Sequence, residues 1–203
     1  MPLRNRVSPF GDIIETPARG LLYGNRGVLH DANRGLVRSW QVRRWIACRL
    51  EFKGRRRADQ MPPGRFTSLY FLDEATALAA GHRPCAECRR EDYRRFQAAW
   101  PGASSKADDM DRALHDERVG PEGSKLLHPE ALNDLPDGAM IAEDGRAWLV
   151  VRGRLIGWTP FGYEEARPRR APRTVDAITP PSIVEAIRRG YRPMLHPSAG
   201  PTR

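Results

Sequence analysis

The sequence predicts an α+β protein, and three observations lead to that class. Eighteen prolines and eighteen glycines among 203 residues imply many turns and short elements. Apolar residues recur at helical spacing through residues 85–100, and shorter alternating stretches follow residue 136. We therefore expect a small module of short strands and a helix pair, followed by a three-stranded meander and a C-terminal helix.

The first half of the chain should begin with strands. Glycine and proline recur through residues 7–30, which favours short strands and turns over a helix. Residues 37–52 are rich in Val, Trp, Ile and Leu between arginines, and they predict one or two strands with a basic face. A loop at 61–64 then precedes an expected strand at 66–71.

Two helices should follow this strand. Asp73 is a suitable N-cap, and Gly81 a suitable left-handed terminator, for a short helix over residues 74–80. A second helix should run over residues 85–100 and stop at Pro101, which cannot continue it. The arginines of this helix should lie largely away from its apolar face: Arg89, Arg90, Arg94 and Arg95.

The second half should form a smaller α+β region. Residues 101–109 are small and polar, so we place the boundary between regions 1–103 and 104–203 there. A helix with an acidic start is expected over residues 107–118. Turn signals separate three expected strands, at residues 138–141, 147–151 and 155–158.

The second half should end in a C-terminal helix. Residues 167–173 are rich in proline and arginine, and they predict a linker. Thr179 would be the N-cap of the helix, with proline in its first turn. Gly190 would end the helix.

Charge and composition favour an anionic partner. The chain has a formal charge of +9, a sequence pI near 10.2 and a mean hydropathy of −0.61. Such a chain favours nucleic acid, DNA before RNA, over a membrane. No apolar run approaches the roughly 18 residues of a spanning helix, and the N-terminus lacks the apolar core of a signal peptide. Three cysteines, an odd number, do not make a disulfide framework, so we expect a cytoplasmic location.

The three cysteines form the most informative motif of the chain. Cys85 and Cys88 have the C-x-x-C spacing at an expected helix start, where a tight turn brings both sulfurs to one side. Cys48 lies 37 residues upstream and would supply a third sulfur to a zinc ion. Zinc prefers four ligands, and the candidates for the fourth are His30, His82 and water. The alternative is three reduced cysteines without a metal.

Basic residues interleave with tryptophan around Cys48. Cationic side chains contact phosphates and aromatic rings stack on bases, so this pattern predicts salt-sensitive, weakly specific binding to nucleic acid. The residues expected to contact phosphate are Arg43, Arg44, Lys53, Arg55, Arg56, Arg57, Arg89 and Arg90. Solvated charge paired with nearby acids would explain the same residues without a partner.

The stretch from Tyr70 to Arg90 includes Ala-Ala-Gly-His-Arg-Pro-Cys-Ala-Glu-Cys-Arg, and it resembles the second half of the Ada-type metal-binding domain. In that family four cysteines hold zinc, and the domain contacts DNA during alkylation repair. One family cysteine accepts a methyl group from a methylated phosphotriester. Where the family has two closely spaced cysteines in its first half, this chain has Cys48 alone. The resemblance implies a zinc-stapled module over residues 1–103.

These observations lead to a zinc-containing nucleic-acid-binding protein, in DNA repair or its regulation. Two enzyme alternatives remain open. Asp111 and His115 are four residues apart on one expected helix face, and with neighbouring acids they could bind Mg²⁺ in a nuclease. Cys48, flanked by arginines, could accept a methyl group as an activated thiolate. The simpler interpretations are acids that favour a helix N-terminus and a structural zinc ligand.

Overall fold

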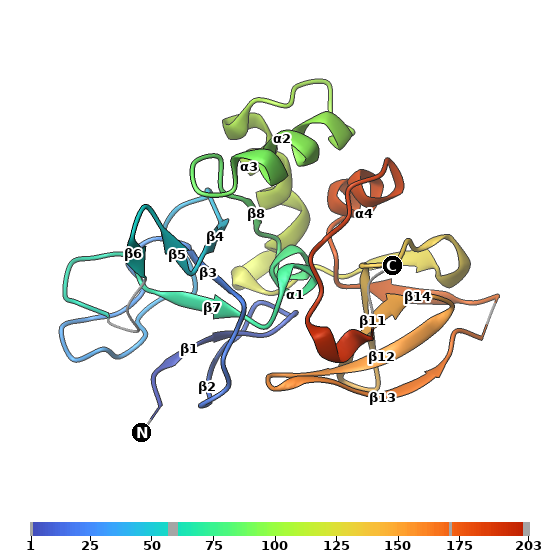
Figure 1. Ribbon diagram of the computed structural model, residues 1–203, viewed down its shortest axis with the longest axis horizontal. Coiled ribbons are helices and arrows are strands. Elements are labelled where there is room, and N and C mark those ends of the chain that lie inside the picture. The colour runs from blue at the N-terminus through green and yellow to red at the C-terminus, as the bar shows by residue number, and fades with distance from the viewer. Residues whose placement is uncertain (1, 57–60, 171, 201–203) are drawn as a thin grey trace.

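The computed structural model describes residues 2–56, 61–170 and 172–200, and it has the predicted α+β class. Two six-stranded sheets lie at the left and right of the molecule in Figure 1, with helix α1 between them and α2, α3 and α4 above. Within the described residues, no helix combines the length and apolar character needed to cross a bilayer.

The N-terminal sheet has the strand order β2-β1-β7-β3-β4-β8. Its strands are β1 (Arg4–Val7), β2 (Ile13–Glu15), β3 (Leu22–Asn25), β4 (Ile46–Arg49), β7 (Leu69–Phe71) and β8 (Arg83–Pro84). The short strands β5 (Glu51–Phe52) and β6 (Arg55–Arg56) form a separate hairpin. Strand β4 is antiparallel to β3 and parallel to β8, so the edge strand β8 lies directly beside β4.

Helix α1 (Glu74–Ala79) has the predicted start and end. The Asp73 side chain accepts a hydrogen bond from the Thr76 amide at 2.8 Å, as an N-cap does. Gly81 has φ +87°, which a glycine adopts without strain. All residues of α1 are buried, because Ala77 packs against the N-terminal sheet while Ala75 and Ala79 pack against the C-terminal sheet.

Helix α2 (Arg90–Ala99) begins five residues later than predicted. The preceding residues 86–89 form a turn instead, and the Cys85 amide donates to the Ala47 carbonyl of β4. This hydrogen bond extends the pairing of β8 with β4, so Cys85 belongs to the sheet edge rather than to the helix. Trp100 is the C-cap, as the following proline requires.

The remaining helices bridge the two halves of the chain. Helix α3 (Ala107–Arg118) has the predicted bounds, and α4 (Pro181–Arg188) lies close to its predicted position. Phe96 of α2, Leu114 of α3 and Ile187 of α4 belong to one buried cluster. This cluster crosses the boundary expected at residue 103. Thr179 does not cap α4: its hydroxyl accepts from the Met140 amide at 2.9 Å, and Pro180 is the N-cap.

The C-terminal sheet has the order β13-β12-β11-β10-β14-β9. Its strands are β9 (His128–Ala131), β10 (Met140–Glu143), β11 (Arg146–Val151), β12 (Arg154–Thr159), β13 (Gly162–Pro168) and β14 (Thr174–Ala177). The predicted meander is its β10-β11-β12 part. The expected linker begins inside β13, where Arg167 pairs with Leu155. Only three of the six strands of this sheet were therefore predicted from the sequence.

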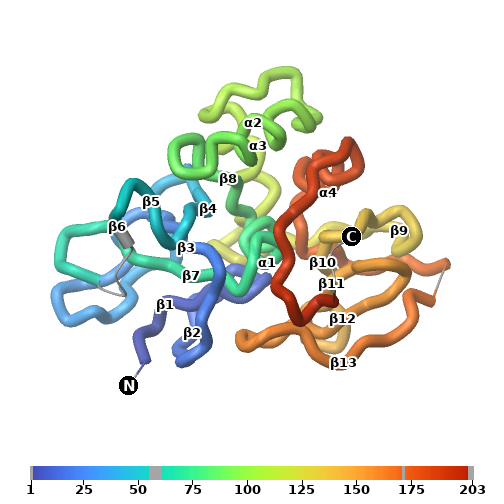
Figure 2. The backbone as a smooth tube through the Cα atoms, viewed as in Figure 1, coloured from blue at the N-terminus to red at the C-terminus, as the bar shows by residue number. Residues whose placement is uncertain are grey.

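The segment after α4 fastens the two halves together, and Figure 2 shows it running down between them. The Glu74 amide donates to the Met194 carbonyl at 3.0 Å, and the Glu74 carboxylate accepts from the Met194 amide at 2.9 Å. The Asp73 carboxylate accepts from the His196 amide and from the Tyr163 hydroxyl, both at 2.9 Å. Short 3₁₀ turns complete the fold: η1 (Pro121–Gly123), η2 (Leu132–Asp134) and η3 (Pro197–Ala199).

Candidate metal centre

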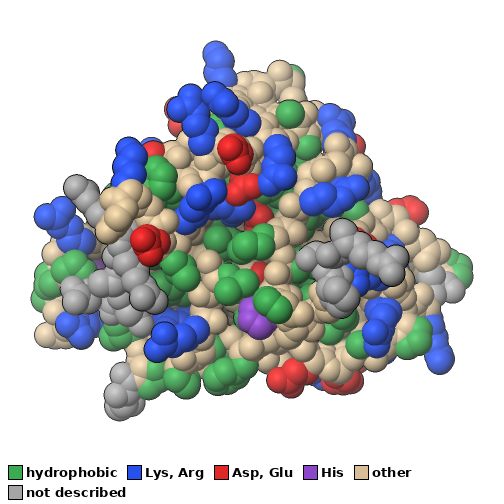
Figure 3. All heavy atoms as spheres, in the orientation of Figure 1, with side chains coloured by type: hydrophobic (Ala, Val, Ile, Leu, Met, Phe, Trp, Pro, Cys, Tyr) green, Lys and Arg blue, Asp and Glu red, His purple; other side chains and the backbone are tan. Residues whose placement is uncertain are grey.

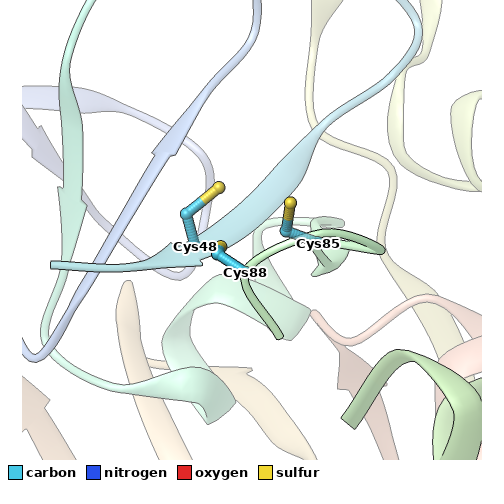
Figure 4. A group of neighbouring side chains, drawn as sticks. All are labelled: Cys48, Cys85 and Cys88. Carbon is cyan, nitrogen blue, oxygen red and sulfur yellow. The ribbon is translucent and has the colours of Figure 1, made fainter. Parts of the chain in front are cut away.

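The structure brings the three cysteines together. Cys48 lies on β4, while Cys85 and Cys88 lie on the turns between β8 and α2. Their three Sγ atoms all lie within 4.8 Å of one another, and all three side chains are buried. Figure 4 shows them as one group formed by the strand and the adjoining loop. This group could hold a metal ion.

Backbone pairing positions these sulfurs. Ile46 and Ala47 of β4 lie opposite Arg83 and Pro84 of β8 in parallel register. The Cys85 amide donates to the Ala47 carbonyl at 3.0 Å, which places Cys85 next to the residue that precedes Cys48. The tight turn then continues, because the Arg89 amide donates to the Cys85 carbonyl at 3.1 Å. The C-x-x-C turn therefore returns its second thiol to the same side.

The cysteines lie on the face of the N-terminal sheet that carries two tyrosines. Strand residues alternate between faces, so Ala47 points into the main core while Cys48 points the other way. Tyr23 pairs with Cys48 on one side and with Tyr70 on the other, and all three belong to the cysteine cluster. The tyrosine rings lie 5.8 Å apart at an edge-to-face angle of 75°. This aromatic wall keeps water from the sulfurs on one side.

The donor set fits a thiolate-binding ion. Sulfurs bound tetrahedrally at about 2.3 Å lie about 3.8 Å apart, which the observed separations of up to 4.8 Å allow with a small contraction. The Arg49 amide donates to the Cys88 sulfur at 3.4 Å, a bond that favours a negatively charged sulfur. Among the described residues, no histidine or carboxylate joins the group as a fourth ligand.

The thiols also influence one another. Hydrogen bonds from Cys48 and Cys88 lower the pKa of Cys85 to about 2, against the opposing effect of burial. The hydrogen bond with Cys85 raises the pKa of Cys48, since that proton is shared with a thiolate. The thiols therefore share protons, and a bound cation would take the place of those protons.

Neither candidate histidine lies in this group. Both ring nitrogens of His30 have other partners: Nδ1 contacts the Thr67 hydroxyl at 2.6 Å, and Nε2 contacts the Pro62 carbonyl at 3.3 Å. His82 is fully buried, with its ring centre 4.5 Å from that of Phe71. His30, which we expected as the fourth ligand, therefore lies outside the cysteine group.

The residues expected to contact phosphate fall into three groups. Arg43, Arg44, Lys53 and Arg90 are exposed. Arg89 is 4% exposed and forms ion pairs with Glu74 at 2.8 Å and Asp92 at 2.9 Å, so it braces α1 against α2 and is not available to phosphate. The side chains of Arg55 and Arg56 and the whole of Arg57 lie outside the described residues.

The residues of the nuclease alternative are already engaged. Both carboxylate oxygens of Asp111 accept hydrogen bonds from the Arg83 guanidinium, at 2.8 and 2.7 Å, and the pair is buried. The His115 ring packs edge-on against Trp40, with 4.6 Å between ring centres. Asp111 thus serves as a counter-ion to a buried arginine, which leaves its oxygens poorly placed to bind Mg²⁺.

Sequence reasoning missed a second charged group, in which Arg26 and Arg118 lie against Trp45. These residues are far apart in the chain, and no local pattern connects them. Comparison with known proteins adds no further assignment: no family model, curated protein or solved structure matches this chain.

Proposed function

We propose that Cys48, Cys85 and Cys88 hold one zinc ion, and that the surrounding basic surface binds nucleic acid. The observation that carries the metal assignment is the convergence of three buried sulfurs within 4.8 Å of one another. A zinc ion bound by the three sulfurs would crosslink β4 to the turn before α2.

Zinc is favoured by the ligand type. Thiolates select soft or borderline ions, and zinc accepts three or four sulfurs in a tetrahedral site without redox chemistry. Because three protein sulfurs leave one position open, a water molecule or a ligand would complete the tetrahedron. Magnesium and calcium are disfavoured, since both prefer oxygen ligands.

Exposed cations adjoin the cysteine group. Arg49 follows Cys48, and Lys53 contacts Glu87, which lies between Cys85 and Cys88, at 3.6 Å. Figure 3 shows Lys and Arg side chains gathered over the upper part of the drawn face, over α2 and α4, with some acidic side chains among them. Arg95 of α2 pairs with Asp92, and Arg188 of α4 pairs with Glu130 and Glu185. Together with the charge of +9, this surface supports salt-sensitive contact with phosphates.

The two enzyme alternatives have less support. A methyl acceptor must meet its substrate, but Cys48 is only 5% exposed. The nuclease would require Asp111 to leave its ion pair with Arg83. A role in DNA repair or its regulation remains a proposal that the Ada-type resemblance motivates.

Fluorescence anisotropy with labelled single-stranded and duplex DNA, and with RNA, tests the nucleic-acid part. Replacing Arg43 and Arg44 together with alanine should weaken binding and reduce the slope of log Kd against log salt by about two. Arg154→Ala is the matched control, because Arg154 is exposed on the C-terminal sheet. Absence of binding at low salt, or equal binding by the double variant, would overturn this part.

A further inference from the structure

A hollow of about 430 Å³ lies apart from the cysteine group. It is bounded by the turn between β1 and β2, the loop between β3 and β4, and the segment after α3. Its described lining residues do not include the cysteines. Its described lining has six charged residues. Five are cations, Arg4, Arg26, Arg38, Arg118 and Lys125, and one is an acid, Asp12.

Two of these cations are buried beside one tryptophan. Arg26 and Arg118 are 1% and 2% exposed. Their guanidinium carbons lie 4.1 and 4.0 Å from the centre of the Trp45 ring, within the range of cation–π attraction. The ring faces therefore hold both guanidinium groups in place at the wall of the hollow.

Lys125 is half-buried, and like the two buried arginines it has hydrogen-bond partners that carry no charge. Each donates to a backbone carbonyl: Arg26 to Gly11 at 2.8 Å, Arg118 to Gly81 at 2.7 Å, and Lys125 to Ala79 at 2.8 Å. Within residues 2–56, 61–170 and 172–200, no carboxylate forms an ion pair with any of these three cations. Nη2 of Arg26 and Nε of Arg118 are buried and have no hydrogen-bond partner in that part of the chain.

Such an arrangement is electrostatically costly. Burial, followed by the charges of Arg118 and Arg26, lowers the pKa of Lys125 to about 7. Burial also lowers the pKa of each of the two arginines to about 9. Buried charges normally have a counter-ion, because desolvation is otherwise unopposed. The one acid of the described lining, Asp12, is exposed, and its charge only partly opposes the effect of burial on the pKa of Arg26. Asp111 and Glu117, outside that lining, likewise only partly oppose it for Arg118.

We propose that this hollow binds a phosphate group, which is the counter-ion of Arg26, Arg118 and Lys125. A phosphate carries one to two negative charges and several acceptor oxygens, which match two guanidinium groups and an ammonium better than one carboxylate does. The unpartnered Nη2 of Arg26 and Nε of Arg118 are the donors left for it. This proposal does not depend on the metal or on the nucleic-acid surface.

The hollow is larger than an inorganic phosphate requires, and it falls in the range of pockets for small organic ligands. Arg4 and Arg38 are exposed at its lining, and Trp40 is partly exposed there. These residues would meet the remainder of the molecule that carries the phosphate. A free phosphorylated metabolite and the terminal phosphate of an oligonucleotide share this chemistry.

Isothermal titration calorimetry of the full-length protein in phosphate-free buffer tests the proposal. The probes are inorganic phosphate and pyrophosphate, with chloride at equal ionic strength as the reference. We expect saturable binding of one equivalent and a rise in Tm with phosphate that chloride does not reproduce. Absence of heat and of a Tm shift at millimolar phosphate, in a folded sample, would overturn the proposal.

Variants separate a binding role from a structural one. Lys125→Met and Arg38→Ala should each weaken pyrophosphate binding, by about tenfold for Lys125→Met, without lowering Tm in phosphate-free buffer. Arg26→Gln should abolish binding, but it removes a buried side chain, so the other two variants keep the test independent of folding. Arg154→Ala should bind as the wild type does. Unchanged affinity in both Lys125→Met and Arg38→Ala would also overturn the proposal.

Matched oligonucleotides distinguish the source of the phosphate. Tighter binding of a 5′-phosphorylated oligonucleotide than of its unphosphorylated form, lost in Lys125→Met, would identify a nucleic-acid end. Competition by mononucleotides or sugar phosphates, with no preference between the two oligonucleotides, would identify a small metabolite. If the Arg43→Ala/Arg44→Ala variant loses nucleic-acid binding but retains pyrophosphate binding, the proposed function and this inference are shown to be separate.

Discussion

The backbone amide of Cys85 donates a hydrogen bond to the carbonyl of Ala47 at 3.0 Å. Because Cys48 follows Ala47 on β4, this one bond places the C-x-x-C turn beside the third thiol. The edge strand β8 is only two residues long, so its pairing with β4 gains little from the ladder itself. We infer that a metal ion shared by the three sulfurs would strengthen this pairing.

Replacement of Cys88 by serine should remove the metal and destabilise the protein. If the free metal is about a thousand times its Kd, its loss costs about 4 kcal/mol in the free energy of unfolding. Metal analysis of the purified variant and urea unfolding measure the two effects. Ala86→Ser is the matched control, since Ala86 is exposed in the same turn and should change neither quantity. Retention of metal by Cys88→Ser would contradict the assignment.

Replacement of Arg83 by methionine should destabilise the protein by about 3–5 kcal/mol, because it leaves the buried Asp111 carboxylate without its partner. The control is Asp109, which lies on α3 as Asp111 does. Asp109 forms an exposed ion pair with Arg112 at 3.3 Å, so Asp109→Asn should cost less than about 1 kcal/mol. Urea unfolding of both variants compares them, and equal costs would show that burial of the Arg83–Asp111 pair has no consequence.

Asp73→Ala should cost about 2–4 kcal/mol, since four donors lose their acceptor at once, the Thr76 hydroxyl at 2.8 Å among them. One carboxylate oxygen caps α1 at the Thr76 amide, and the other accepts from Tyr163 and from the His196 amide. Asp116→Asn, at an exposed position of α3, is the control and should be near neutral. Hydrogen exchange should also show faster exchange of the His196 amide in Asp73→Ala. A cost equal to that of the control would mean that the C-terminal segment is held by other contacts.

Lys125 gives the stability a defined pH dependence. Its pKa falls from the ordinary 10.5 to about 7, chiefly through burial and then through Arg118 and Arg26, with Glu117 opposing. Between these values the unfolded chain binds a proton that the folded protein has released, so the contribution of Lys125 to stability rises with pH across that window. Below about pH 7 both states are protonated, and the cost of the half-buried ammonium in the folded protein is constant.

The variant Lys125→Met lacks this titration. In phosphate-free buffer, the wild type should gain stability relative to Lys125→Met as the pH rises from about 7 to about 9. Urea unfolding of the two proteins at several pH values gives the difference, in which the other titrating groups cancel. Parallel pH profiles for the two proteins would show that Lys125 keeps an ordinary pKa in the folded protein.

Local signals predicted the elements whose ends depend on local chemistry. The bounds of α3 agree with its acidic start and apolar spacing, and α1 begins and ends at the predicted cap and glycine. Helix α2 starts late because Cys85 is drawn to the sheet edge, a contact with residues almost 40 positions upstream that helical spacing does not reveal. The pairing of β14 with β9, more than 40 residues apart, was missed for the same reason.

The candidate site was predictable only in part. The C-x-x-C spacing indicated a metal site, and Cys48 was the only other cysteine available to it. The burial of Arg89 was not predictable, because its partner Glu74 lies on a different helix. The contacts of Arg26 and Arg118 with Trp45 join three distant segments, and each arginine alone resembles an ordinary surface charge in the sequence.

The metal content of the protein purified without added metal, together with its thermal unfolding in a chelator, tests the central claim most directly. The account predicts about one zinc per chain, removed by the chelator together with a clear fall in Tm. A chain that carries no metal, and whose unfolding the chelator leaves unchanged, would contradict it and would make Cys48, Cys85 and Cys88 ordinary buried thiols.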